Sequence, residues 1–262
     1  MRLVQRIILF IYCALVVMAF APSSYGQVNN QSKPAIKIVI DYSPPYIMEQ
    51  NGKITGIATQ IVESALSAKQ VSTDIKQLPW TDVKLSVDSE KVLSFWWHIN
   101  KQREKSWLFS KPIYQAEYVF LARKAVRFYW TRFDQLRPYK IGLSHIQSYG
   151  EVFDSYIQYL NTEKTLSDFS AIKKLLDGQL DAILIEKSMA FYLMNYLTDE
   201  ERQRLELFEE QVLHKEPYFL VCAKFFNNCS YYINQLNEGL KLLKNSGRYE
   251  AIIRSNRTLN EN

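Results

Sequence analysis

Arg103 is the side chain of this sequence with the clearest potential for chemistry. It lies in a basic turn that leads directly into an aromatic segment, and the segment closes on Ser110-Lys-Pro-Ile-Tyr114. A guanidinium held beside rigid rings suits planar, two-point recognition of a carboxylate. An arginine on a basic chain can equally lie on the surface as a solvated charge. Spacing alone leaves both interpretations open.

The elements that would position Arg103 alternate between strands and helices. Hydrophobic periodicity predicts strands at 36–41, 74–78, 92–97, 118–122, 139–143, 180–185 and 217–223, and helices at 57–68, 80–87, 149–160, 168–176, 188–196, 230–244 and 248–253. Ser188 is the expected N-cap of its helix, and Gly178 the expected end of the helix before it. Such alternation predicts an α/β sheet with right-handed crossovers.

Ligands of α/β sheets bind beyond the carboxyl ends of the strands. The loops to search for function are therefore 42–46, 97–103, 144–148 and 186–188. Trp97 and His98 stand together at the end of one predicted strand. This position favours a ligand role for Trp97, whereas for His98 a structural polar role and a ligand role both stay open. Trp80, Trp96 and Trp107 are expected in the core, as most aromatic side chains are.

Length, charge and histidine spacing limit the possible functions. The chain has 262 residues, 47% of them apolar, which is enough for one large domain or two lobes of roughly 100 residues each. The net charge of +5 is spread along the sequence, so no nucleic-acid-binding arm is expected. His98, His145 and His214 stand apart from one another and from any cysteine pair. This spacing predicts no metal site. We also expect no cofactor, no enzymatic activity and a monomeric protein.

The first residues have the pattern of an export signal. Arg2 and Arg6 precede an apolar run from 7 to 21, and small residues at 24 and 26 predict cleavage before Gln27. The apolar run is shorter than the ~20 residues that span a bilayer, which argues against a membrane anchor. Tyr12 before Cys13 argues against a lipoprotein cleavage site. We expect a mature, soluble protein in the periplasm.

Export places Cys222 and Cys229 in an oxidising compartment. They are the cysteines that remain after cleavage, and they lie seven residues apart across a predicted strand-to-helix turn. A disulfide and two separate buried thiols both fit this spacing.

Several loop motifs, in this order, resemble the family-3 extracytoplasmic solute-binding proteins, which deliver polar amino acids to ABC importers. The motifs are Tyr42-Ser-Pro-Pro-Tyr46 with Gly52 and Gly56, the segment 103–114, Ile141-Gly-Leu143 with Ser148-Tyr149, Leu176-Asp-Gly-Gln-Leu-Asp-Ala182, and Lys244-Asn-Ser-Gly247 with Tyr249 and Ile252. The resemblance covers about residues 35–255. It implies a type II periplasmic-binding-protein fold, in which two α/β lobes are joined by two hinge strands.

The resemblance also implies boundaries and a mechanism. Lobe 1 would comprise residues 33–115 and 217–257, and lobe 2 residues 116–216. A ligand in the cleft between them would favour the closed state, because only closure brings it into contact with both lobes.

By motif position, Arg103 would bind the α-carboxylate of an amino acid and Glu186 its α-amino group. Asn100 would add a hydrogen bond. The other positions that match ligand-contacting positions of the family are His98, Gln147 and Ser148, with Tyr42 and Tyr46 as an aromatic wall. The expected function is therefore capture of a small polar ligand, an amino acid or a related carboxylate, for the membrane permease of an ABC importer.

Some positions depart from the family pattern. Trp96 and Trp97 replace small residues, and Ile146 replaces a glycine, so the pocket is expected to be tighter and more aromatic. Loss of amino-acid binding stays open as an alternative. Two further functions stay open: a sensory receptor of the same fold that signals to a separate membrane kinase or cyclase, and a periplasmic dehydratase-like enzyme with His98 and Glu186 as acid and base.

Overall fold

The computed structural model describes residues 34–145 and 147–257. The predicted signal peptide at 1–26 and Ile146 lie outside these ranges. The residues from Pro34 onwards form one compact unit. Within the described part, no helix combines the length and the apolar character that a membrane crossing requires.

The first part of the unit is built on short strands, of which β1 and β5 are mostly buried. β1 (Ile36–Ile40) pairs in parallel with β4 (Thr73–Gln77), and a single bridge links β1 to Leu93, next to β5 (Ser94–Trp97). A small hairpin of β2 (Met48–Gln50) and β3 (Lys53–Thr55) follows the loop after β1. The other elements of this part are α2 (Ile57–Ser67), α3 (Trp80–Ser89), α4 (Arg103–Ser106) and β6 (Trp107–Phe109).

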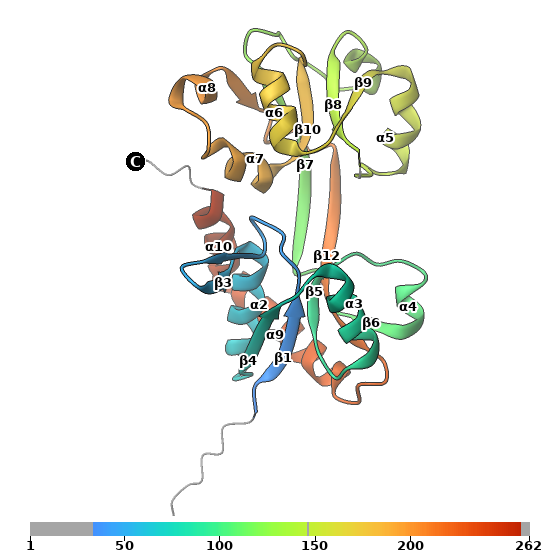
Figure 1. Cartoon of the computed structure of the whole chain (residues 1–262), viewed down its shortest axis with the longest axis vertical. Helices are drawn as coiled ribbons and strands as arrows, with labels where there is room; N and C mark the ends of the chain where they lie inside the picture. Colours follow the sequence, from blue (N-terminus) through green and yellow to red (C-terminus); the bar gives the residue numbers. More distant parts are fainter. Residues whose placement is uncertain (1–33, 146, 258–262) are drawn as a thin grey trace, which may run out of the picture. The chain divides into compact units, whose positions relative to one another are not determined.

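Two ten-residue strands connect the first part of the unit to the second (Figure 1). β7 (Tyr114–Arg123) and β12 (His214–Ala223) are antiparallel and pair between residues 114–118 and 214–218. Beyond this ladder, β12 pairs with β5 and β6, whereas β7 pairs with β10 and β11. The predicted lobe boundaries, after 115 and after 216, fall inside the ladder and stay a prediction.

The second part is organised around a sheet in the order β7-β10-β8-β9. β8 pairs in parallel with both β10 and β9, as the helices between them require. Its elements are β8 (Lys140–Ser144), α5 (Glu151–Tyr156), β9 (Asn161–Thr165), α6 (Asp168–Leu176), β10 (Ala182–Glu186), α7 (Lys187–Met194), α8 (Asp199–Gln203) and β11 (Leu205–Leu207).

Two helix ends test the expectations from sequence. α6 ends where predicted, and Gly178 follows it with a φ of 77°, a conformation that glycine adopts without strain. The expected N-cap of α7 is wrong. Glu186 is the N-cap instead of Ser188, because its carboxylate reaches back to accept a hydrogen bond from the backbone N–H of Met189 at 2.8 Å.

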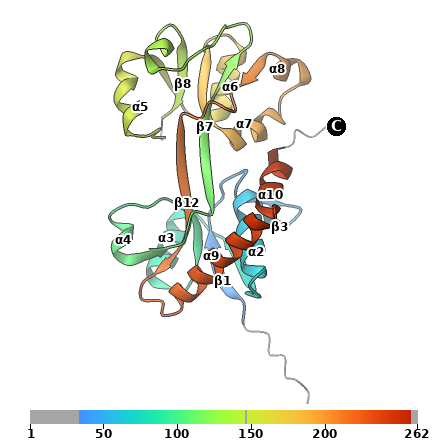
Figure 2. The same cartoon turned by 180° about the vertical axis from the view of Figure 1, so that it is seen from behind.

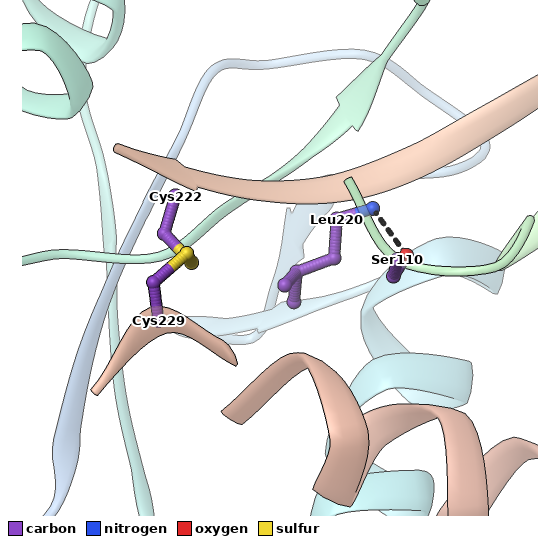
Figure 3. The surroundings of a disulfide bond; sticks show 4 residues. All are labelled: Ser110, Leu220, Cys222 and Cys229. Carbon is purple, nitrogen blue, oxygen red and sulfur yellow. Dashed lines mark hydrogen bonds between the residues drawn. A yellow bond between two sulfur atoms is a disulfide. The ribbon is translucent and has the colours of Figure 1, made fainter. Parts of the chain in front are cut away.

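α9 (Cys229–Asn245) and α10 (Arg248–Arg257) return the chain to the first part, where both pack against α2. In the view from behind, α9 crosses in front of β1 (Figure 2). Gly239 of α9 packs directly on α2, and a Cβ there would lie 2.0 Å from the carbonyl oxygen of Ala65. Cys222 at the end of β12 and Cys229 at the start of α9 form a disulfide (Figure 3). Of the two alternatives for these cysteines, a disulfide or two separate thiols, the structure has the disulfide. Close by, Ser110 Oγ accepts a hydrogen bond from the backbone N–H of Leu220 at 3.0 Å (Figure 3).

Candidate functional site

A cavity of about 240 Å³ lies beside the β7–β12 ladder, and we call it the Glu186 cavity. It is lined by Ser43, Tyr46, Trp96, Ala116, Tyr118, Ser144, Gln147, Tyr149, Asp168, Leu184, Glu186, Met189 and Tyr218. These residues come from both parts of the unit, as expected for a cleft between two lobes. Its volume is below the ~300–1,000 Å³ of pockets for drug-sized ligands, so it suits a small molecule.

Glu186 ends β10 and is 6% exposed. Its carboxylate accepts hydrogen bonds from the hydroxyl of Tyr46, from the hydroxyl of Tyr114 at 3.0 Å and from the backbone N–H of Met189. Tyr46 lies in the loop after β1, 140 residues earlier in the chain. Hydrogen bonds to a charged acceptor compensate a buried carboxylate for the loss of water. Glu186 therefore joins the two parts of the unit.

A stack of aromatic rings forms one wall of the cavity. The indole of Trp96 lies between the rings of Tyr46, at 4.0 Å between centroids, and Tyr218, at 3.8 Å. Trp96 has a φ of 77°, a left-handed conformation that a bulky residue rarely adopts. Trp96 thus contributes to the cavity wall, and its expected place in the core is only partly right.

Asp168, the first residue of α6, is the second acid of the cavity. Burial raises the pKa of its carboxyl to about 6, which outweighs the effect of its place at a helix N-terminus. Within the described part of the chain, its side chain makes no hydrogen bond or ion pair. The N-cap of α6 is instead Ser167, whose hydroxyl accepts the backbone N–H of Ser170 at 3.1 Å.

Arg103 does not line the Glu186 cavity. Its guanidinium lies over the rings of Trp97, at 4.7 Å from the centroid, and Trp107, at 5.7 Å, and it donates to the carbonyl oxygen of His98 at 2.9 Å. Cation–π attraction to two indoles holds it there, and burial lowers its pKa. In this structure Arg103 and Glu186 therefore do not line the same cavity, and their expected roles on opposite walls of one cleft stay a prediction.

A second cavity, of about 520 Å³, contains Arg103 and shares no lining residue with the Glu186 cavity. Asn100 also lines it, and its side-chain oxygen accepts the backbone N–H of Arg103, the first residue of α4, at 2.8 Å. Lys84 and Asp88 form an ion pair of 2.6 Å at its edge, and Asp88 also accepts the indole N–H of Trp107. We call this the Arg103 cavity.

Trp97 and His98 have structural contacts in place of the expected ligand contacts. Trp97 is 4% exposed, packs edge-on against Trp107 and donates its indole N–H to Ser94 at 2.7 Å, so it belongs to the core. The Nδ1 atom of His98 lies 2.9 Å from a carboxylate oxygen of Glu216. Burial lowers the pKa of His98, and Glu216 partly offsets that effect.

The remaining predicted residues divide between the cavity and the surface. Tyr46 and Gln147 line the Glu186 cavity, as Glu186 does. Tyr42 is 58% exposed and lines neither cavity. The hydroxyl of exposed Ser148 donates to Asp154 at the start of α5, and Ser148 is not among the lining residues of the cavity; its ligand role stays a prediction.

Sequence reasoning missed Asp168, Tyr118, Tyr149 and Tyr218 as cavity residues. Tyr118 lies on β7, where buried residues alternate with more exposed ones from Tyr114 to Tyr118, so strand periodicity was an available signal there. Tyr218 lies in a continuous buried run of β12, which gives no such signal. Asp168 follows β9, a strand that the sequence pattern did not indicate, so the loop after that strand was not among the predicted ligand-binding loops.

The charges of the cavity are of one sign. Two carboxyl groups line it, and among the described residues its lining contains no lysine, arginine or histidine. Across the described residues, no group of three or more His, Cys, Asp or Glu side chains converges as a metal site would. The cavity therefore offers acceptors, phenol hydroxyls and aromatic surface.

The chain is similar to known proteins in sequence and in structure. The model of the family described as bacterial extracellular solute-binding proteins, family 3, matches residues 36–256. A curated relative, the L-cystine-binding protein TcyJ of Escherichia coli strain K12, is 24% identical over 171 residues, which are 64% of this chain and 64% of TcyJ. The chain thus matches just under two thirds of that relative's length.

Solved structures share the fold at low identity. The second substrate-binding domain of a protein from Streptococcus pneumoniae superposes with a TM-score of 0.71 at 16% identity, covering 86% of this chain and 99% of that one. An ancestral cationic amino acid solute-binding protein gives 0.68 at 18% identity, covering 86% and 96%. Domain 2 of Lactococcus lactis GlnP, in its open conformation, gives 0.69 at 14%, covering 88% and 97%. The predicted type II α/β fold is confirmed.

Proposed function

Because the chain belongs to the bacterial extracellular solute-binding proteins of family 3, we propose that it captures a small polar solute in the Glu186 cavity. The observation that supports this most directly is the cavity itself. It lies where two α/β parts meet, and residues from both parts line it. A solute in it would contact both lobes and favour their closure.

The proposed partner is the membrane permease of an ABC importer, and the proposed location is the periplasm after cleavage of the signal peptide. The relatives are described as binding proteins and not as enzymes. TcyJ binds L-cystine by its name, and the ancestral protein is named for cationic amino acids. We therefore direct the first ligand screen to amino acids and to the amines derived from them.

The test is a thermal-shift screen of the purified protein against the protein amino acids, L-cystine, aliphatic diamines and dicarboxylates. A ligand at a hundred times its Kd stabilises the folded state by about 2.7 kcal/mol, and we expect at least one compound to raise the Tm. Gln147→Trp should abolish the shift, because an indole from a half-buried lining residue would fill the cavity.

Gln158→Trp is the matched control, since Gln158 is exposed on the same part of the molecule. It should keep the shift. A shift that survives Gln147→Trp would place the ligand elsewhere and contradict the proposal, as would a screen in which no compound shifts the Tm. Loss of uptake of the labelled ligand in cells lacking the gene would distinguish the importer from a sensory receptor.

A further inference from the structure

The chemistry of the Glu186 cavity identifies a class of solute, and this inference rests on the proposed function. An α-amino acid presents a carboxylate and an ammonium group, so its binding site requires a cation as well as an anion. In this chain the expected cation, Arg103, lines a different cavity and lies against two indole rings. The Glu186 cavity has no basic side chain in its lining to replace it.

Backbone donors beside the cavity are largely occupied by the protein itself. At α5, which begins just after the lining residue Tyr149 and has no side-chain cap, Asp154 accepts the backbone N–H of Tyr149 at 3.0 Å. The other two helices that begin beside the cavity, α6 and α7, are capped by side chains of this chain. Glu186 accepts the N–H of Met189 at the start of α7, and Ser167 accepts that of Ser170 at the start of α6. A carboxylate in the cavity would face two acids without a cationic partner, which is unfavourable in a partly buried site.

A positively charged ammonium group meets the opposite situation. The Asp168 carboxyl lines the cavity without a hydrogen bond or ion pair inside the described part of the chain, and it is available as an acceptor. Tyrosine and tryptophan rings line the same space, and such rings attract organic cations through their faces. Phenol oxygens of Tyr118, Tyr149 and Tyr218 add further acceptors.

We propose that the Glu186 cavity binds a small aliphatic amine or diamine and does not require a carboxylate on its ligand. Asp168 accepts the ammonium group, and the aromatic wall surrounds the methylene chain. The volume of about 240 Å³ suits a chain of a few methylene groups.

The test compares amino acids with the amines obtained from them by loss of the carboxylate. Isothermal titration calorimetry measures the Kd of the purified protein for cadaverine against L-lysine, putrescine against L-ornithine and cystamine against L-cystine. We expect at least one amine to bind, and each amine that binds to do so at least as tightly as its amino acid. Tighter binding of the amino acid in the pairs that bind overturns this inference and leaves the proposed function standing. Absence of binding by every compound overturns both.

Variants locate the interaction. Asp168→Asn should weaken binding of the tightest amine by at least tenfold, because a hydrogen bond to a charged group is lost. Asp177→Asn, at the exposed other end of α6, makes the same change of charge and should keep the native Kd. Arg103→Ala should also keep it. Native affinity in Asp168→Asn, or a tenfold loss in Arg103→Ala, overturns the inference.

Discussion

At the scale of single residues, the two acids of the Glu186 cavity differ in their hydrogen bonding. Glu186 has donors on both carboxylate oxygens, and these donors come from the protein itself. Asp168 makes no such contact within the described residues, and its pKa is raised to about 6 by burial. Of the two acids, Asp168 is therefore the one that the protein's own donors leave open within the described residues, whereas a ligand role for Glu186 stays a prediction.

The raised pKa of Asp168 gives a pH dependence with a definite sign. A cation binds the ionised carboxylate, so affinity for cadaverine should rise as the pH increases through about 6 and level off above pH 7. With a pKa of about 6, the ionised fraction falls about tenfold between pH 7.5 and pH 5, and the Kd should rise by the same factor. Calorimetric titrations across this range measure it.

Other groups around Asp168 require a control for this experiment. Tyr118 and Tyr149 interact with it electrostatically, but burial raises their pKa values above the range studied. Glu186 shares the cavity, and His214 lies against Tyr118 at 6.0 Å between ring centroids. Asp168→Asn should remove the pH dependence if Asp168 causes it. If Asp168→Asn keeps the pH dependence of the native protein, the titrating group is one of the others around the cavity and not Asp168.

At the scale of elements, the close contact between α2 and α9 depends on the absence of a side chain at Gly239. Gly239→Ala would place a Cβ 2.0 Å from the carbonyl oxygen of Ala65, so the two helices would have to separate. Overpacking of this kind typically costs ~1–3 kcal/mol, and we expect a loss of that size in urea unfolding. Asn234→Ala, on the exposed face of the same helix, should stay within about 0.5 kcal/mol of the native protein. Equal stability of the two variants would show that the helices adjust without cost.

Elements that are buried on both faces could be predicted from the sequence, and polar edge elements could not. β10 is an apolar run of buried residues, and its prediction as a strand was right. β9 has the sequence Asn-Thr-Glu-Lys-Thr and pairs only with β8, so its exposed edge allows polar residues and hides the strand. Because β9 was not predicted, the loop after it, which leads to Asp168, was not predicted as a ligand-binding loop.

The environment of Arg103 shows a second limit of sequence reasoning. The motif correctly indicated a turn and an aromatic frame around the guanidinium. It could not show that Trp97 and Trp107, large residues near the motif arginine, would place their rings under the guanidinium. Side-chain direction also depends on backbone angles such as the φ of 77° at Trp96, which no residue pattern indicates. The residues of the site were therefore only partly predictable.

At the scale of the whole molecule, the first and second parts are joined by two kinds of contact. The β7–β12 ladder is continuous backbone, and bending of such strands is the usual hinge of two-lobed binding proteins. The hydrogen bonds of Tyr46 and Tyr114 to Glu186 are contacts between side chains that a hinge motion can break. We infer that these hydrogen bonds already favour the closed state before a solute binds. A bound solute would then strengthen this preference for the closed state.

Tyr46→Phe tests this inference, because it removes one hydroxyl and keeps the ring that stacks on Trp96. Without its bond to Glu186, the protein without ligand should open, and small-angle X-ray scattering should give a radius of gyration roughly 1 Å above the ~17 Å expected for a compact unit of this length. Tyr42→Phe is the control, since the ring of Tyr42 is 58% exposed in the same loop, and it should scatter as the native protein does. If Tyr46→Phe also keeps the native radius, the bond to Glu186 does not govern closure, and the hinge alone sets the balance between open and closed states.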